Sequence, residues 1–147
     1  MNDSIEFSFN RTNVEQIANH LHVCNDSFTP PLSERVVIDD YARKIFENAD
    51  RFEAWAGGIL IGLVAVYCND KKLSVAYITS VSVLQSWQGK GIASQLITKC
   101  LAYIKSLGFE RVDLEVYQKN KAAIILYRKY GFHRTKLNAN IFSKSLK

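Results

Sequence analysis

The stretch over residues 88–94 has the composition of a loop that binds phosphate. Gly89, Gly91 and Ala93 keep side-chain bulk small just where a helical pattern begins, and Lys90 adds positive charge. The first turn of a helix has backbone N–H groups without intrahelical partners and carries the positive end of the helix dipole, so it can hold a diphosphate. Taken alone, the same residues are equally typical of a tight strand-to-helix turn.

This stretch differs from two other phosphate-binding motifs. It lacks the Gly-Lys-Ser/Thr ending of a nucleoside-triphosphate loop, and it does not follow the Gly-x-Gly-x-x-Gly spacing of dinucleotide folds. We therefore disfavour both of these classes.

His20, His22 and Cys24 alternate along the chain and raise the question of a metal site. Residues two apart on a helix do not share a face, so only the pair four apart could converge. We expect no metal here. The remaining cysteines, Cys68 and Cys100, fit no zinc or redox spacing, so we expect buried packing, no cysteine chemistry and a reducing compartment.

Hydrophobic periodicity predicts the elements that must position the loop. Alternation over residues 5–9 indicates a first strand. Apolar residues at helical spacing indicate a helix over about 13–22, with Thr12 and Glu15 as its capping box, and a second helix over about 33–48.

The rest of the chain alternates strands and helices. The predicted elements are strands over 52–56, 59–67 and 73–84 with a polar turn over 69–72, a helix from 92 to Gly108, a strand over 112–116, a helix over 120–130, and a final hairpin of 132–137 and 141–146. The order is β-α-α-β-β-β-α-β-α-β-β, an α/β fold with a mixed sheet. Strand-to-helix units that end near Leu84 and Val116 imply two parallel strands joined by a crossover helix. Ligands of such sheets bind beyond the carboxyl ends of the strands.

Composition limits the class of protein. The 147 residues fit one domain, 1–147, and 48% hydrophobic against 22% charged residues is typical of a packed globular chain. The sequence has no run long enough to span a membrane and no secretory signal, so we expect a cytoplasmic protein. The net charge of +5 favours anionic partners, but the basic residues are scattered, which makes nucleic acid an unfavoured partner.

Gln88, Gly91 and Ala93 match the signature Gln/Arg-x-x-Gly-x-Gly/Ala of the GNAT superfamily of N-acetyltransferases, which this sequence resembles. Val81–Ser82–Val83 looks like the strand whose backbone pairs with the pantetheine arm of coenzyme A. Further matches downstream are Leu114–Glu115–Val116, Asn120, Ala123, Leu126–Tyr127 and Gly131–Phe132. The resemblance covers residues 73–133 and implies a centrally splayed sheet with flanking helices.

The resemblance also implies acetyl-coenzyme A as co-substrate and a primary amine as acceptor. The cofactor-binding residues that it implies are Val81, Ser82, Val83, Gln88, Gly89, Lys90, Gly91, Ile92, Ala93, Ser94 and Asn120. In the family the amine attacks the thioester directly, so the lack of a nucleophile motif is consistent with this chemistry.

Two residues are implied to be catalytic. Tyr127 resembles the general acid that protonates the departing thiolate, although by pattern alone it is a core aromatic residue on an apolar helix. Glu115 resembles the base that members acting on peptide N-termini use to deprotonate the ammonium; its alternative is an ordinary solvent-facing strand residue. Asn120 is expected to cap the following helix as well as to contact the cofactor. Thr79 and Ser80 stand where some relatives carry an acidic residue, which argues against a base on that strand.

The acceptor pocket of this family is usually built by the loop between the first two helices, here residues 28–32, and we expect specificity to lie there and near Tyr41 and Tyr67. The sequence leaves the acceptor open among an amino sugar, an aminoglycoside, a polyamine and a protein N-terminus. A noncatalytic acyl-coenzyme A-binding regulatory module is the alternative function, and a charge-driven nucleic-acid or ribosome-associated role is a third. A homodimer formed through the last hairpin is compatible with the resemblance.

Overall fold

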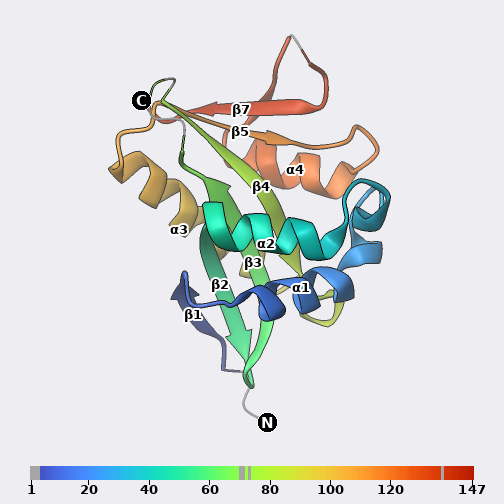
Figure 1. Cartoon of the computed structure of the whole chain (residues 1–147). Helices are drawn as coiled ribbons and strands as arrows, with labels where there is room; N and C mark the ends of the chain where they lie inside the picture. The colour runs from blue at the N-terminus through green and yellow to red at the C-terminus, as the bar shows by residue number, and fades with distance from the viewer. Residues whose placement is uncertain (1–3, 70–71, 73, 137) are drawn as a thin grey trace.

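The protein is built around one seven-stranded sheet, shown in Figure 1 for a computed structural model that describes residues 4–69, 72, 74–136 and 138–147. The strands are β1 (Glu6–Phe9), β2 (Asp50–Ala56), β3 (Ile59–Tyr67), β4 (Val75–Val83), β5 (Arg111–Glu115), β6 (His133–Arg134) and β7 (Ile141–Ser145). Their spatial order is β1-β2-β3-β4-β5-β7-β6. The predicted element order and mixed α/β class are confirmed.

The described residues form four α-helices, which cover the two faces of the sheet. They are α1 (Val14–Val23), α2 (Ile38–Asn48), α3 (Ile92–Ser106) and α4 (Lys121–Lys129). In Figure 1, α1 and α2 cross in front of the sheet, while α3 and α4 lie behind it. Each pair buries its own apolar cluster against the sheet, one on the α1/α2 face and one on the α3/α4 face. This two-sided burial explains why β3 is apolar almost throughout.

The strands β4 and β5 pair in parallel over only part of their length. Their register runs from Val75 opposite Arg111 to Ile78 opposite Leu114, and no further pair follows although β4 continues to Val83. The crossover through α3 accounts for the parallel direction, as the sequence predicted. Beyond Ile78 the sheet is therefore open between its two central strands.

A β-bulge marks the point where β4 leaves β5. The register of β3 with β4 changes from Ala65 opposite Ser80 to Val66 opposite Ile78, which leaves Thr79 as the extra residue of β4. Because a bulge bends its strand and increases its twist, it helps to turn β4 away from β5. The Tyr41 hydroxyl of α2 donates a hydrogen bond of 2.7 Å to the Thr79 carbonyl and so holds the bulge.

The start of α1 differs from the prediction. Asn13, not Thr12, is the N-cap residue, and it forms the capping box with Gln16 rather than Glu15. The Thr12 hydroxyl is instead engaged by the buried Glu53 carboxylate of β2. A tertiary partner thus overrode a local capping pattern.

The second helix also starts later than predicted. It begins at Ile38, and the segment before it forms a short 3-10 turn over Leu32–Glu34. Extended backbone at Val37 separates the two, which lets both Leu32 and Ile38 reach the apolar cluster under α1 and α2. Asp39 in the first turn then lies at the positive end of the helix dipole.

The last hairpin is shorter than predicted on its first strand, which covers His133–Arg134 rather than 132–137. Strand β7 pairs with β6 on one side and with β5 on the other. Predicted positions 70, 71, 73 and 137 lie outside the described residues. Among the helices that the structure describes, none is long and apolar enough to cross a bilayer.

Candidate functional site

The gap between β4 and β5 connects two hollows in the protein surface. A groove of about 410 Å³ runs from the start of α3 along the end of β4, and a pocket of about 220 Å³ lies between the α1–α2 segment and β5. Both are lined by Phe28, Val81, Asn120, Ala123 and Tyr127. The shared residues come from both halves of the chain, so the opening in the sheet brings the two hollows together.

The amino end of α3 forms one end of the groove. Gly91 is its N-cap residue, with φ of 80°, and no side chain of the described residues caps the helix. The described residues offer the amides of Ile92, Ala93 and Ser94 no hydrogen-bond partner. Gly89 also has φ of 80°, and a Cβ at either glycine would meet open space. Glycine is therefore needed for the left-handed backbone of the loop, which leaves free donors facing the groove.

Gln88 and Lys90 support this loop in different ways. The Gln88 side-chain amide donates a hydrogen bond of 3.1 Å to the Val83 carbonyl, which ties the loop to the end of β4. The Lys90 ammonium lies 6.0 Å from the centre of the Trp87 ring. Gln88 thus braces the loop, while Lys90 stays at its exposed rim.

Val81, Ser82 and Val83 lie where β4 has left β5. Each pairs with β3 on one side, and β5 does not reach them on the other. The Ser82 hydroxyl lies 2.8 Å from Nε2 of His20 on α1, so its side chain is engaged on the α1 face. Only the backbone of Ser82 is therefore available to a ligand in the groove.

Tyr127 lies at the junction of the groove and the pocket. Its side chain is 8% exposed and its ring packs edge-on against Phe132, with ring centres 5.9 Å apart. Among the described residues its hydroxyl has no hydrogen-bond partner, and burial raises the pKa of this phenol well above its usual value. Tyr127 is thus a core aromatic residue, as its pattern indicated, that also presents a protonated hydroxyl beside two hollows.

Glu115 ends β5 and lines the pocket. Its carboxylate Oε1 lies 3.9 Å from Nη1 of Arg35, and its side chain is 38% exposed. Burial and then the charge of Glu115 raise the pKa of the neighbouring Tyr77. The carboxylate therefore lines the pocket while remaining partly exposed to solvent.

Asn120 caps α4, as predicted. Its side-chain oxygen accepts a hydrogen bond of 3.2 Å from the Ala123 amide. Because Asn120 also lines both hollows, capping places it at the junction beside Tyr127.

The pocket contains residues that the sequence did not reveal. Phe28, Leu32 and Tyr41 line it as expected, but Tyr67 does not. Burial raises the pKa of Tyr41 to about 12, so its hydroxyl stays protonated where it meets Thr79. Three of the additional lining residues are Arg35, Tyr77 and Tyr117. They come from three segments far apart in the chain, and no spacing pattern links them.

Of His20, His22 and Cys24, the two residues four apart converge, with the Cys24 Sγ atom 3.6 Å from Nε2 of His20. The His20 Nδ1 atom donates to the Leu60 carbonyl at 2.8 Å, which leaves Nε2 to accept from Ser82. His22 pairs instead with Asp39 at 2.8 Å. Within the described residues no group of three or more histidines, cysteines or acidic residues could hold a metal ion.

The comparisons with known proteins agree with this geometry. The model of the acetyltransferase (GNAT) family matches residues 14–132, and the chain therefore belongs to this family. N-alpha-acetyltransferase MAK3 of Arabidopsis thaliana is 34% identical over 86 residues, 58% of this chain and 45% of that protein. The ribosomal protein bS18-alanine N-acetyltransferase of Haemophilus influenzae is 31% identical over 72 residues, 49% of each protein. The matches thus span less than half the length of these relatives.

Solved structures share the fold over nearly the whole chain. PaiA N-acetyltransferase from Thermoplasma acidophilum, in complex with coenzyme A, superposes with a TM-score of 0.73 at 17% identity, over 97% of this chain and 99% of that one. A protein from Arabidopsis thaliana, in complex with the bisubstrate analogue CoA-Ac-MVNAL, gives a TM-score of 0.73 at 22% identity, over 95% and 98%. At these identities the likeness concerns the fold alone.

Proposed function

We propose that this protein is an N-acetyltransferase that moves the acetyl group of acetyl-coenzyme A to the primary amine of a small-molecule or peptide acceptor, by direct attack in a ternary complex. One observation carries the proposal: the Tyr127 hydroxyl, which has no hydrogen-bond partner among the described residues, stands where a separate pocket meets a groove that ends at the first amides of α3. A donor and an acceptor bound in these two hollows would meet beside that hydroxyl.

The groove has the features that acetyl-coenzyme A requires. The free amides of Ile92, Ala93 and Ser94, together with the helix dipole, would hold the diphosphate. The edge of β4 at Val81–Val83, which lacks a strand partner on the β5 side, would pair with the amide groups of the pantetheine arm. A solved neighbour of the same fold contains coenzyme A, which supports this choice of co-substrate.

Tyr127 would act on the leaving group. As the acceptor nitrogen bonds to the thioester carbonyl carbon, the carbon–sulfur bond breaks and the thiolate needs a proton or a strong hydrogen bond. A phenol whose pKa burial raises is protonated at neutral pH and can supply either. Its position in a largely buried junction strengthens such a hydrogen bond, because little water competes for it.

Glu115 would act on the acceptor. An ammonium must lose a proton before its nitrogen can attack, and the Glu115 carboxylate in the pocket can accept that proton directly or through one water. The nitrogen loses two protons between ammonium and amide. The first goes to Glu115 before the attack, and the second, lost from the nitrogen after the attack, replaces the proton that Tyr127 gives to the thiolate. The products are then the amide, the thiol and one proton on Glu115.

The test compares Tyr127→Phe with Tyr103→Phe, which removes a hydroxyl bonded to Asp50 outside both hollows. Thiol release from acetyl-coenzyme A would be measured with spermidine, glucosamine, the peptide MVNAL and the twenty amino acids as acceptors. We expect Tyr127→Phe to lower kcat by roughly 10²- to 10⁴-fold with little change in affinity for acetyl-coenzyme A, and Tyr103→Phe to change neither.

Binding of acetyl-coenzyme A would be followed by the thermal midpoint, since a ligand at 100 times its Kd stabilises by about 2.7 kcal/mol. An unchanged kcat in Tyr127→Phe would remove the role of the acid. Binding without turnover on any acceptor would favour the noncatalytic module, and absence of both would refute the proposed function.

A further inference from the structure

Arg35 is held in the pocket by aromatic rings from two separate segments. Its guanidinium carbon lies 6.0 Å from the centre of the Phe28 ring and 5.4 Å from that of Tyr117, and its side chain is 29% exposed. Phe28 precedes α2, whereas Tyr117 follows β5. The two rings therefore favour a position of the charge in the pocket wall.

The donors of this guanidinium have no hydrogen-bond partner among the described residues. The one ion pair that Arg35 makes there, with Glu115, has its atoms 3.9 Å apart, which is longer than the 2.7 to 3.2 Å typical of an N–H···O bond. Arg51 gives a contrast within the same chain, because its guanidinium donates to Thr12, Phe46 and Ala49. A partly buried arginine with unused donors is suited to bind a carboxylate with two parallel hydrogen bonds.

The pocket thus presents one positive and one negative group side by side, Arg35 and Glu115, in a wall made largely of tyrosine, phenylalanine and aliphatic side chains. A ligand that carries an ammonium and a carboxylate on one carbon has the complementary pair of charges at a similar spacing. Its carboxylate would insert beside the guanidinium and its ammonium beside the Glu115 oxygen. Four alternating charges would then form a closed ring.

We propose that the acceptor is a free α-amino acid, whose carboxylate Arg35 binds while Glu115 receives its ammonium group. This inference rests on the proposed function and names its substrate class. The pocket volume of about 220 Å³ lies below the roughly 300 to 1,000 Å³ of sites for drug-sized ligands, which fits a single amino acid. A polyamine would bring a second positive charge towards Arg35, and a peptide N-terminus has an uncharged amide where the carboxylate should be.

The test compares each of the twenty L-amino acids with its C-terminal amide as acceptor, in thiol release at saturating acetyl-coenzyme A. The two members of a pair differ in the group that Arg35 would bind, and the amide also has the less basic amine, which works against the expected preference for the acid. We expect at least one acid to exceed its amide tenfold or more in kcat/KM, which corresponds to about 1.4 kcal/mol.

Arg35→Gln should lower kcat/KM for that acid at least tenfold, mainly through KM, and leave the amide within about threefold. Arg35→Lys keeps the charge but not the planar pair of donors, so it should recover part of the loss. Arg43→Gln, on the exposed side of α2, changes the net charge equally and should have no effect. Thermal midpoints would establish that each variant is folded.

The inference is overturned if amides equal or exceed their acids in the wild-type protein, or if Arg35→Gln lowers the rates of acid and amide alike. Turnover of spermidine, glucosamine or the peptide MVNAL with none of the amino acids would also overturn it and leave the proposed function intact. Absence of both acetyl-coenzyme A binding and thiol release would instead defeat the two proposals together.

Discussion

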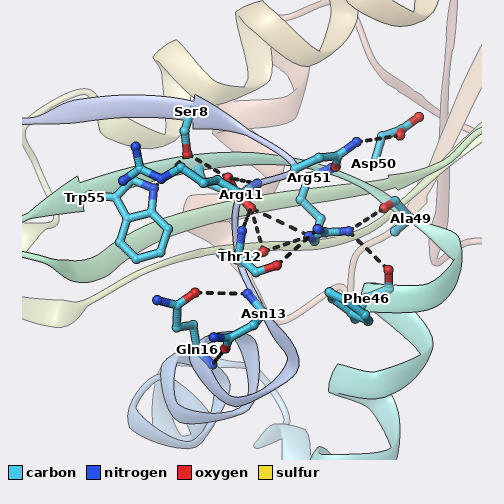
Figure 2. Close-up of polar contacts among 12 residues, drawn as sticks. Ser8, Arg11, Thr12, Asn13, Gln16, Phe46, Ala49, Asp50, Arg51 and Trp55 are labelled. Carbon is cyan, nitrogen blue, oxygen red and sulfur yellow. Dashed lines mark hydrogen bonds and ion pairs between the residues drawn. The ribbon is translucent and has the colours of Figure 1, made fainter.

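Glutamine in place of Glu53 tests the buried polar network that joins the first strand and the start of α1 to the sheet. Glu53 is fully buried, and its Oε1 atom accepts hydrogen bonds from the Ser8 hydroxyl at 2.6 Å and the Arg11 amide at 2.8 Å. Its Oε2 atom accepts from the amide and the hydroxyl of Thr12. The Thr12 hydroxyl in turn accepts from Arg51, whose side chain lies beside Thr12, Ala49 and Phe46 in Figure 2.

The size of the effect follows from these contacts. Glutamine keeps one side-chain oxygen and replaces the other by an NH2 group. This NH2 group would face the backbone N–H of either Arg11 or Thr12, so two hydrogen-bond donors would point at each other. A buried donor left without a partner costs about 1 to 3 kcal/mol. Arg51, whose Nε lies 3.6 Å from Glu53, would also lose its buried counter-charge, and breaking such a pair costs about 3 to 5 kcal/mol. These costs overlap, and Arg51 keeps its other hydrogen bonds, so we expect a loss of about 3 kcal/mol.

Urea and thermal unfolding of the two proteins would measure this loss. For a chain of this size, 3 kcal/mol lowers Tm by roughly 6 to 12 °C. Glu6→Gln is the matched control, because it makes the same chemical change in an ion pair with Arg11 that is more than half exposed, where at most about 1 kcal/mol is expected. Equal Tm values for the two variants would refute the reasoning that the buried carboxylate organises this region.

Two further predictions concern protons. Glu115→Gln should change the pH dependence of kcat measured by thiol release, because the proposed acceptor of the ammonium proton is gone; an identical profile would return Glu115 to a purely structural role. For His20, burial lowers the pKa, outweighing its hydrogen bonds to Leu60 and Ser82. As the pH falls, this histidine is therefore protonated first in the unfolded chain, near pH 6.5. Below pH 6.5 the free energy of unfolding should decrease by up to about 1.4 kcal/mol per pH unit. The slope should be smaller in His20→Gln, and equal slopes in urea unfolding at pH 5 to 7 would contradict the assignment.

Much of the fold could be predicted because its signals are local. Each of these signals depends on a few neighbours in the chain: the alternating residues before the first helix, the apolar stripe of α3 and the glycines at the ends of the strands. The predicted helix starts were wrong where a residue distant in the sequence bonds to the segment or packs against it. Thr12 lost its capping role to Glu53 of β2, and residues 33–37 left the helical pattern in a segment that packs Leu32 and Ile38 into one cluster.

The same difference between local and long-range signals applies to the residues of the candidate site. The glycine loop, Asn120 and Tyr127 lie in short motifs around helix starts and within one helix, so the sequence by itself determined the family resemblance and the position of the groove. Arg35, Tyr77 and Tyr117 meet in the pocket only because a bulge at Thr79 and the end of pairing at Ile78 open the sheet. Strand register and the path of a loop depend on contacts between residues distant in sequence, and that is why only the tertiary structure decided which charges line the pocket.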